Sequence, residues 1–363
     1  MQLHDLNLKI LNRESGEIEM KAKFLIYCLL AVAVVGVGFS SSQAQNERRG
    51  TAGASELLVP VTARTAGIGS RLTGGLDGLN PLEAVLSNPA AMTSGHGTAA
   101  YFSRSEYVAD IGINYFGIGQ TFGNNTLALT VNAWDYGDIQ KTTEANPELG
   151  ELTFGANNVV FGISYARLFT DRISAGFTIK GINETIDDVS ATGVAFDAGM
   201  TYVAGESGLR FGVALQHFGP QMSYSGNGLV HFAALPSQQT DAKQNAVTID
   251  AEAFELPSQL NVGVAYARPL GDAAVVTLNG NFASNSFSQD VFSGGLEFGV
   301  MDLLFIRGGL QLQSETDFTF YQGYNFGAGL NLDLSGSHLT VDYAYLPTDY
   351  FKAVNMFSIG LEL

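Results

Sequence analysis

Residues 159–180 read VVFGISYARLFTDRISAGFTIK and alternate large apolar side chains with small or polar ones. Every second residue from Val159 to Tyr165, and again from Ile173 to Ile179, is apolar. Side chains of a β-strand point alternately to two faces, so a period of two predicts two strands here. The runs at 194–202 and 209–216 repeat the pattern.

The second face of these strands is small and polar and carries few charges. Charged residues make up 15% of the chain, which contains 43 glycines. A soluble sandwich also alternates. However, a glycine-rich polar face suits strands that turn apolar side chains to lipid and small ones to an interior. The sequence therefore predicts an all-β transmembrane barrel.

Counting such runs gives about fourteen strands, an even number as in bacterial outer-membrane barrels. The predicted ranges are 98–107, 109–121, 126–137, 158–168, 172–183, 193–203, 208–218, 258–268, 273–284, 291–300, 303–313, 323–334, 338–347 and 355–363. Tight breaks alternate with mostly long ones, such as 138–157, 184–192 and 219–257. Since these barrels have short periplasmic turns, both barrel ends are expected in the periplasm. The last strand must pair with the first, because an open edge would leave backbone groups unsatisfied in lipid.

The N-terminal region has the features of an export signal. Lys21 and Lys23 follow Met20, residues 24–37 are apolar, and Ser42-Gln43-Ala44 offers a cleavage site. A membrane anchor is the alternative, but the apolar run is short for a bilayer span. We therefore expect an upstream extension at 1–19, a signal peptide at 20–44, an N-terminal segment at 45–97 and the barrel at 98–363.

Cysteine and charge exclude several kinds of site and partner. Cys28 is the only cysteine and lies in the predicted signal, so the mature chain is expected to have no disulfide or thiolate site. The net charge is −17, which makes nucleic acid a poor partner. No cofactor is expected.

The segment at 57–97 differs from the rest because its glycines discourage long regular elements, although Pro81 to Leu86 suits a short helix. It contains ARTAGIG at 63–69 and NPA at 88–90, and its glycines fit no nucleotide-binding loop. These motifs, with DYGDI at 135–139, QHFGP at 216–220 and VDYAY at 341–345, resemble the PorV/PorQ family of FadL-like outer-membrane barrels. The resemblance implies a 14-stranded antiparallel barrel with an N-terminal hatch segment in the lumen. The hatch motif would comprise Arg64, Gly67, Gly69, Asn88, Pro89 and Ala90.

The inward face of the predicted strands carries glycines and charges. A barrel of about fourteen strands encloses more volume than its own side chains fill. We interpret its inward glycines as room for the 57–97 segment; the alternative is that they permit curvature. The inward charges are expected to pair with one another or to clamp the hatch, and proton relay or ion selection is the alternative. They are Lys180, Asp197, Arg210, Glu297, Arg307 and Asp342.

Two further features bear on function. None of the histidines expected in the mature chain lies in a catalytic or metal motif, so an enzyme is not expected; His217 is predicted at a rim on the apolar face. The segment at 219–257 is the longest predicted loop, and long loops are usually functional or disordered. Its apolar residues suit a partner or ligand, or contacts with the barrel itself. The candidates are Tyr224, Leu229, Val230 and Phe232.

Two functions follow from the resemblance. PorV-like proteins belong to the type IX secretion system, which implies a translocon and the carboxy-terminal domains of cargo proteins as partners, contacted through extracellular loops. A FadL-like channel for hydrophobic small molecules is the alternative. The fold supports both, because function depends on sites added to it. Outer-membrane lipid is the expected surrounding in either case.

Overall fold

The structure is a computed structural model that describes residues 50–363 except 70, 77, 143–151, 234–244 and 314–319. The described residues belong to one compact unit, Gln45–Leu363. The predicted upstream extension and signal peptide lie outside the described residues. Among those residues, no helix is long and apolar enough to cross a membrane.

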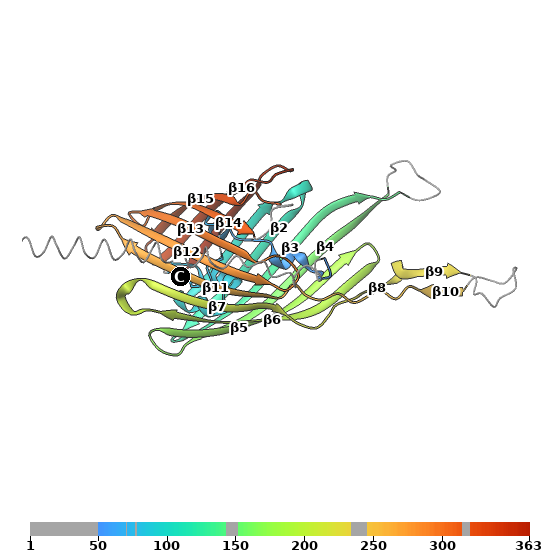
Figure 1. Cartoon of the computed structure of the whole chain (residues 1–363), viewed down its shortest axis with the longest axis horizontal. Coiled ribbons are helices and arrows are strands. Elements are labelled where there is room, and N and C mark those ends of the chain that lie inside the picture. Colours follow the sequence, from blue (N-terminus) through green and yellow to red (C-terminus); the bar gives the residue numbers. More distant parts are fainter. Residues whose placement is uncertain (1–49, 70, 77, 143–151, 234–244, 314–319) are drawn as a thin grey trace, which may run out of the picture. The chain divides into compact units, whose positions relative to one another are not determined.

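Fourteen of the described strands form a closed antiparallel barrel (Figure 1), as predicted. Neighbours in sequence are neighbours in the sheet except that β7 pairs with β11, and β1 pairs with β17 to close the ring. The strands are β1 (Thr98–Glu106), β2 (Gly112–Phe122), β3 (Asn125–Gln140), β4 (Thr153–Leu168), β5 (Ile173–Ile186), β6 (Val189–Val203), β7 (Leu209–Phe218), β11 (Gln259–Pro269), β12 (Ala274–Asn285), β13 (Val291–Val300), β14 (Leu304–Gln313), β15 (Tyr324–Leu334), β16 (Ser337–Leu346) and β17 (Val354–Glu362).

Two connections differ from the prediction. The predicted loop at 184–192 is wrong, because β5 and β6 continue until only Asp187 and Asp188 join them. Asp187 turns the chain with a φ of 51°. Between β1 and β2, the short 3-10 helix η4 (Val108–Asp110) delays the start of the second strand to Gly112.

The segment at 219–257 is not wholly a loop. It contains β8 (Tyr224–Gly226), the 3-10 helix η6 (Asn227–Leu229), β9 (Val230–Ala233) and β10 (Asn245–Thr248). β8 extends the sheet by pairing with β6, whereas β9 and β10 pair only with each other. Figure 1 shows β9 and β10 as a hairpin beyond the ends of the barrel strands. The β-branched and aromatic residues of these short runs favour strand pairing.

The two faces of the barrel wall follow the predicted alternation. Outward side chains are large and apolar, such as Phe161 and Ile163, which are 56% and 61% exposed, whereas the neighbouring Ser164 is buried. An exposed apolar belt of this kind belongs in lipid. The closed ring and its apolar belt are the architecture of outer-membrane barrels.

The described part of the N-terminal segment contains four short helices: η2 (Ser55–Leu58), α2 (Ala63–Gly67), α3 (Pro81–Ser87) and η3 (Pro89–Ser94). The Asn80 side chain accepts a hydrogen bond from Leu82 N, and Pro81 occupies the first turn, a combination that favours a helix start. The helix predicted from Pro81 to Leu86 is therefore confirmed. Asn88 caps η3 in the same way by accepting from Ala90 N.

Candidate functional site in the barrel lumen

The N-terminal segment packs against the inner wall where the strands carry glycine. A Cβ added to Gly67 would lie 2.8 Å from Gly327 Cα of β15, and one added to Gly69 would lie 2.9 Å from the Gly309 backbone of β14. Only glycine permits two backbones to approach this closely. Other inward glycines differ, because Gly299 and Gly329 face side chains of the barrel itself.

The NPA motif holds the other side of the segment. Asn88 Nδ2 donates to the carbonyl oxygens of Thr73 at 2.8 Å and Met200 at 3.1 Å. Ser174 Oγ of β5 donates to Ala90 O at 2.9 Å. A Cβ on Gly176 would lie 2.7 Å from the Pro89 carbonyl. The segment therefore has contacts on opposite parts of the ring, from β5 and β6 to β14 and β15.

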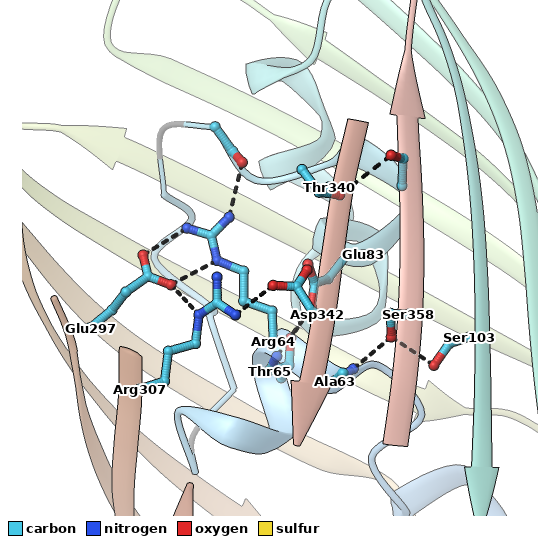
Figure 2. Close-up of polar contacts among 12 residues, drawn as sticks. Ala63, Arg64, Thr65, Glu83, Ser103, Glu297, Arg307, Thr340, Asp342 and Ser358 are labelled. Atoms are coloured by element: carbon cyan, nitrogen blue, oxygen red, sulfur yellow. Dashed lines mark hydrogen bonds and ion pairs between the residues drawn. The ribbon is translucent and has the colours of Figure 1, made fainter. Parts of the chain in front are cut away.

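Arg64 is the centre of a buried ion-pair cluster on one side of the lumen. Figure 2 shows its guanidinium facing Glu297 of β13, with Nε 3.0 Å from Oε2 and NH2 2.8 Å from Oε1. Its NH1 donates to Gly78 O at 2.9 Å. Arg307 contacts the same Glu297 carboxylate and also Asp342. Burial acts to lower the pKa of Arg64, but the Glu297 carboxylate raises it above its usual value.

Glu83 of α3 adds a third carboxyl group to this cluster. It accepts hydrogen bonds from Thr65 N at 3.1 Å and Thr65 Oγ1 at 3.0 Å. Burial, and then repulsion from Asp342, raise the pKa of Glu83. Both effects favour the neutral form of Glu83. The charged groups of the cluster are then two arginines and the carboxylates of Glu297 and Asp342. Such balance matters because an unpaired buried charge is strongly destabilising.

A second buried cluster contains Lys180 and Asp197, with Nζ 2.5 Å from Oδ2. His217 completes it: its backbone N donates to Asp197 Oδ1 at 2.8 Å, and its Nδ1 lies 3.2 Å from Lys180 Nζ. The prediction of His217 at an apolar rim is wrong. Its φ of 58° and a bulge, in which Gln216 and His217 both oppose Asp197, turn two successive side chains inward.

Five of the six predicted lumen charges fall into two clusters. Glu297, Arg307 and Asp342 join Arg64, and Lys180 joins Asp197. Arg210 is half-buried beside the β6–β7 connection, in register with Val203 and Ala265.

A third polar group lies where η2 meets the barrel. The buried Glu56 faces Glu184 of β5, whose carboxylate accepts a hydrogen bond from the Tyr224 hydroxyl. Burial, and then the Glu184 charge, raise the pKa of Glu56 to about 8. Tyr224 therefore contacts the barrel, whereas Phe232 of β9 is 69% exposed. Leu229 and Val230 are half-buried.

A cavity of about 300 Å³ lies between the N-terminal segment and the barrel wall. Residues 57–61, with sequence LLVPV, supply an apolar part of its lining. The strands supply mostly polar groups, including Gln259, Asn281 and Asn325. The cavity also borders Lys180 and His217 of the second cluster. In the described part of the chain, no three His, Cys, Asp or Glu side chains form a group that could hold a metal ion.

Solved structures with a similar fold include two toluene transporters. The toluene transporter TbuX of Ralstonia pickettii aligns with a TM-score of 0.52 at 12% identity, over 83% of this chain and 98% of its own. The Pseudomonas putida toluene transporter TodX gives 0.52 at 10% identity, over 82% and 96%. A Pseudomonas aeruginosa FadL homologue gives 0.53 at 12% identity, over 84% and 98%. The chain has the FadL-like barrel fold.

The similarity is confined to the fold at these identities. No protein-family model and no curated protein sequence matches the chain. The part of the predicted resemblance that concerns the FadL-like barrel is confirmed, whereas membership of the PorV/PorQ branch stays a prediction. The role of the hatch motif also stays a prediction, although its residues take part in the contacts described above.

Several residues of the site were missed by the sequence reading. Glu83 and Glu56 lie outside the strands, and nothing in their neighbourhood marks them as buried acids. The inward amides of the barrel wall could have been predicted from the sequence. Gln259 and Asn261, and also Asn279 and Asn281, alternate with apolar or small residues on predicted strands. Their inward positions follow from the same period of two that identified the barrel.

Proposed function

We propose that the protein is an outer-membrane channel for the uptake of small hydrophobic molecules. The observation that carries the proposal is the cavity of about 300 Å³ inside a barrel of this fold. This volume is at the lower end of the range for small-molecule sites. The lining from residues 57–61 offers a molecule an apolar surface away from water, which favours binding of hydrophobic compounds.

The N-terminal segment would act as the movable element. It reaches across the lumen, with contacts between α2 and β15 or β16 and between η3 and β5 or β6. A molecule that leaves the cavity toward the far end of the barrel must pass this segment. Opening would require separation from the wall near Ala63, whose backbone N donates to Ser358 Oγ of β17 at 2.9 Å.

The proteins of similar fold support transport rather than catalysis. TbuX and TodX are toluene transporters. Their low identity to this chain leaves the compound open, because pocket side chains and not the fold determine which ligand binds.

A cysteine pair tests both the transport and the movement. Ala63→Cys with Ser358→Cys introduces two thiols at this contact, so that oxidation can cross-link the segment to β17. Cells producing the wild-type barrel should take up the hydrophobic dye N-phenylnaphthylamine faster than cells without it. Oxidation of the double variant should lower the rate, and a reductant should restore it. The two single-cysteine variants are the controls and should not respond to oxidation. If cells with the wild-type barrel take up the dye no faster than cells without it, the proposal is contradicted.

Secretion is a second candidate, favoured by the β9–β10 hairpin. Phe232, Val247 and Ile249 expose apolar surface on or beside it. A type IX role would use such a surface to bind a translocon or the carboxy-terminal domain of a cargo protein. A photo-crosslinker at Phe232 tests this in cells of the native host. Recovery of exported proteins that share a carboxy-terminal domain would support secretion, and recovery of no protein would exclude this surface as their binding site.

A further inference from the structure

Primary amides form much of the barrel side of the cavity. Strands β11, β12, β14 and β15 place the amides of Gln259, Asn281, Asn285, Gln311 and Asn325 against it. A primary amide is neutral and both donates and accepts hydrogen bonds. A bare hydrocarbon offers such groups no partner, and burial of an unpartnered amide costs free energy. The lining therefore favours a ligand with polar groups of its own.

Part of this amide surface is held in a fixed orientation. Asn261 Nδ2 donates to Gln216 Oε1 at 3.0 Å, and Asn281 Nδ2 donates to Asn261 Oδ1 at 3.2 Å. Thr73 Oγ1 of the N-terminal segment donates to Asn281 Oδ1 at 2.7 Å. Such a chain of bonds orients the amides before any ligand arrives, which reduces the entropy lost on binding.

Four polar atoms of residues that border the cavity have no hydrogen-bond partner among the described residues: His217 Nε2, Asn325 Oδ1, Asn132 Oδ1 and Tyr321 Oη. His217 and Asn325 are only 3% and 2% exposed. Because the Lys180 ammonium can only donate, His217 Nδ1 accepts from it, and the hydrogen of a neutral imidazole is then on Nε2. These side chains border the cavity, and small movements of them would present the His217 donor and the acceptors of Asn132 and Asn325 to a ligand.

The charged side chains that border the cavity already have partners. Lys180 Nζ lies 2.5 Å from the Asp197 carboxylate. Arg71 NH1 donates to Gln216 Oε1 at 3.1 Å and to Leu86 O at 3.3 Å. A carboxylate ligand would have to compete with these bonds and would also meet the negative charge of Asp197. A carboxylate would therefore have to displace existing bonds of both cations before it could pair with either, whereas an uncharged ligand leaves these bonds in place.

We infer that the cavity selects small uncharged amphiphiles, with an apolar body and a hydroxyl or carbonyl group, over bare hydrocarbons and over carboxylates of the same size. The inference rests on the proposed function and narrows its substrate class. The apolar body lies against residues 57–61, and the polar group bonds with His217 Nε2–H or with the free amide oxygens. One hydrogen bond gained in a buried site favours the ligand that makes it, so roughly fivefold selectivity is expected.

Three probes that share a 4-methylphenyl group test the selectivity: 4-methylphenol, toluene and 4-methylbenzoate. Their binding to the whole barrel in lipid nanodiscs is measured by equilibrium dialysis at pH 7, with empty nanodiscs as background. We expect 4-methylphenol to bind about fivefold more tightly than toluene and more tightly than 4-methylbenzoate. Equal or tighter binding of toluene or of 4-methylbenzoate would overturn the inference but leave the channel proposal standing. Binding of none of the three would count against both.

The variant Asn325→Leu should bring the ratio of 4-methylphenol to toluene affinity close to one. Asn331→Leu is the matched control, because Asn331 is a half-buried amide on the same strand that does not border the cavity; it should keep the ratio. Asn132→Leu, on β3, repeats the test if Asn325→Leu does not assemble. An unchanged ratio in both cavity variants would overturn the assignment of these amides.

Discussion

Arg64 of the N-terminal segment and Glu297 of β13 form a two-point ion pair, with N–O distances of 2.8 and 3.0 Å, although 233 positions separate them in sequence. Both side chains are almost fully buried. A guanidinium and a carboxylate match in shape, so the pair fixes the orientation of α2 as well as its position. Arg307 shares the same carboxylate, and this ties the segment to β14 and, through Asp342, to β16.

Removal of Arg64 should loosen the N-terminal segment. Arg64→Met leaves Glu297 with one arginine instead of two, and breaking a buried pair costs about 3–5 kcal/mol. We expect faster cleavage within residues 50–97 of the folded barrel by proteinase K, a protease of broad specificity whose sites do not depend on arginine. Arg172→Met is the control, since its ion pair with Asp171 is exposed and such pairs contribute about 0–1 kcal/mol. Equal cleavage of the two variants would show that the buried pair does not hold the segment.

Substitution of two glycines in this segment distinguishes the effect of close packing from the effect of backbone strain. Gly69 and Gly78 have φ values of 69° and 67°, but only at Gly69 would a Cβ meet a neighbour, the Gly309 backbone at 2.9 Å. Gly78→Ala should cost about 1 kcal/mol from the left-handed backbone alone. Gly69→Ala adds a steric clash of about 1–3 kcal/mol and should lower the thermal unfolding midpoint further. Similar unfolding midpoints for the two variants would mean that the segment can move away from β14 without loss of stability.

The strands could be predicted from sequence because alternation is a local property. Val159 to Tyr165 and Ile173 to Ile179 identify β4 and β5 without any knowledge of their neighbours. His217 could not be placed, since its positive φ depends on Asp197 of the adjacent strand, which accepts from its backbone N. The partner of Arg64 could not be predicted either. The sequence identified six inward charges, but it did not show which of them face the N-terminal segment.

The second cluster should respond differently to single and double substitution. Lys180→Met leaves the Asp197 carboxylate buried without its closest cation, at a cost of about 3–5 kcal/mol. Lys180→Met with Asp197→Asn removes both charges and keeps an amide oxygen that can accept from His217 N. We expect urea to unfold the single variant at lower concentration than the double variant. The prediction fails if the double variant is the less stable of the two.

The contact between η2 and the barrel should depend on pH through Glu56. Its pKa is raised from 4.5 to about 8, first by burial and then by Glu184, so the packed state binds the proton more tightly than the detached state does. Packing of η2 is therefore strongest below pH 4.5 and weakens as pH rises, until the effect is complete above about 8. Amide hydrogen exchange of residues 52–59 is measured at pH 5, 7 and 9. Its rate should rise with pH more steeply than the intrinsic exchange rate of an unprotected amide does. Glu56→Gln, which stays neutral, should follow the intrinsic rate alone, and Glu255→Gln serves as the comparison because its carboxyl group is not part of this pair. If Glu56→Gln and the wild type respond alike, the pH dependence arises elsewhere.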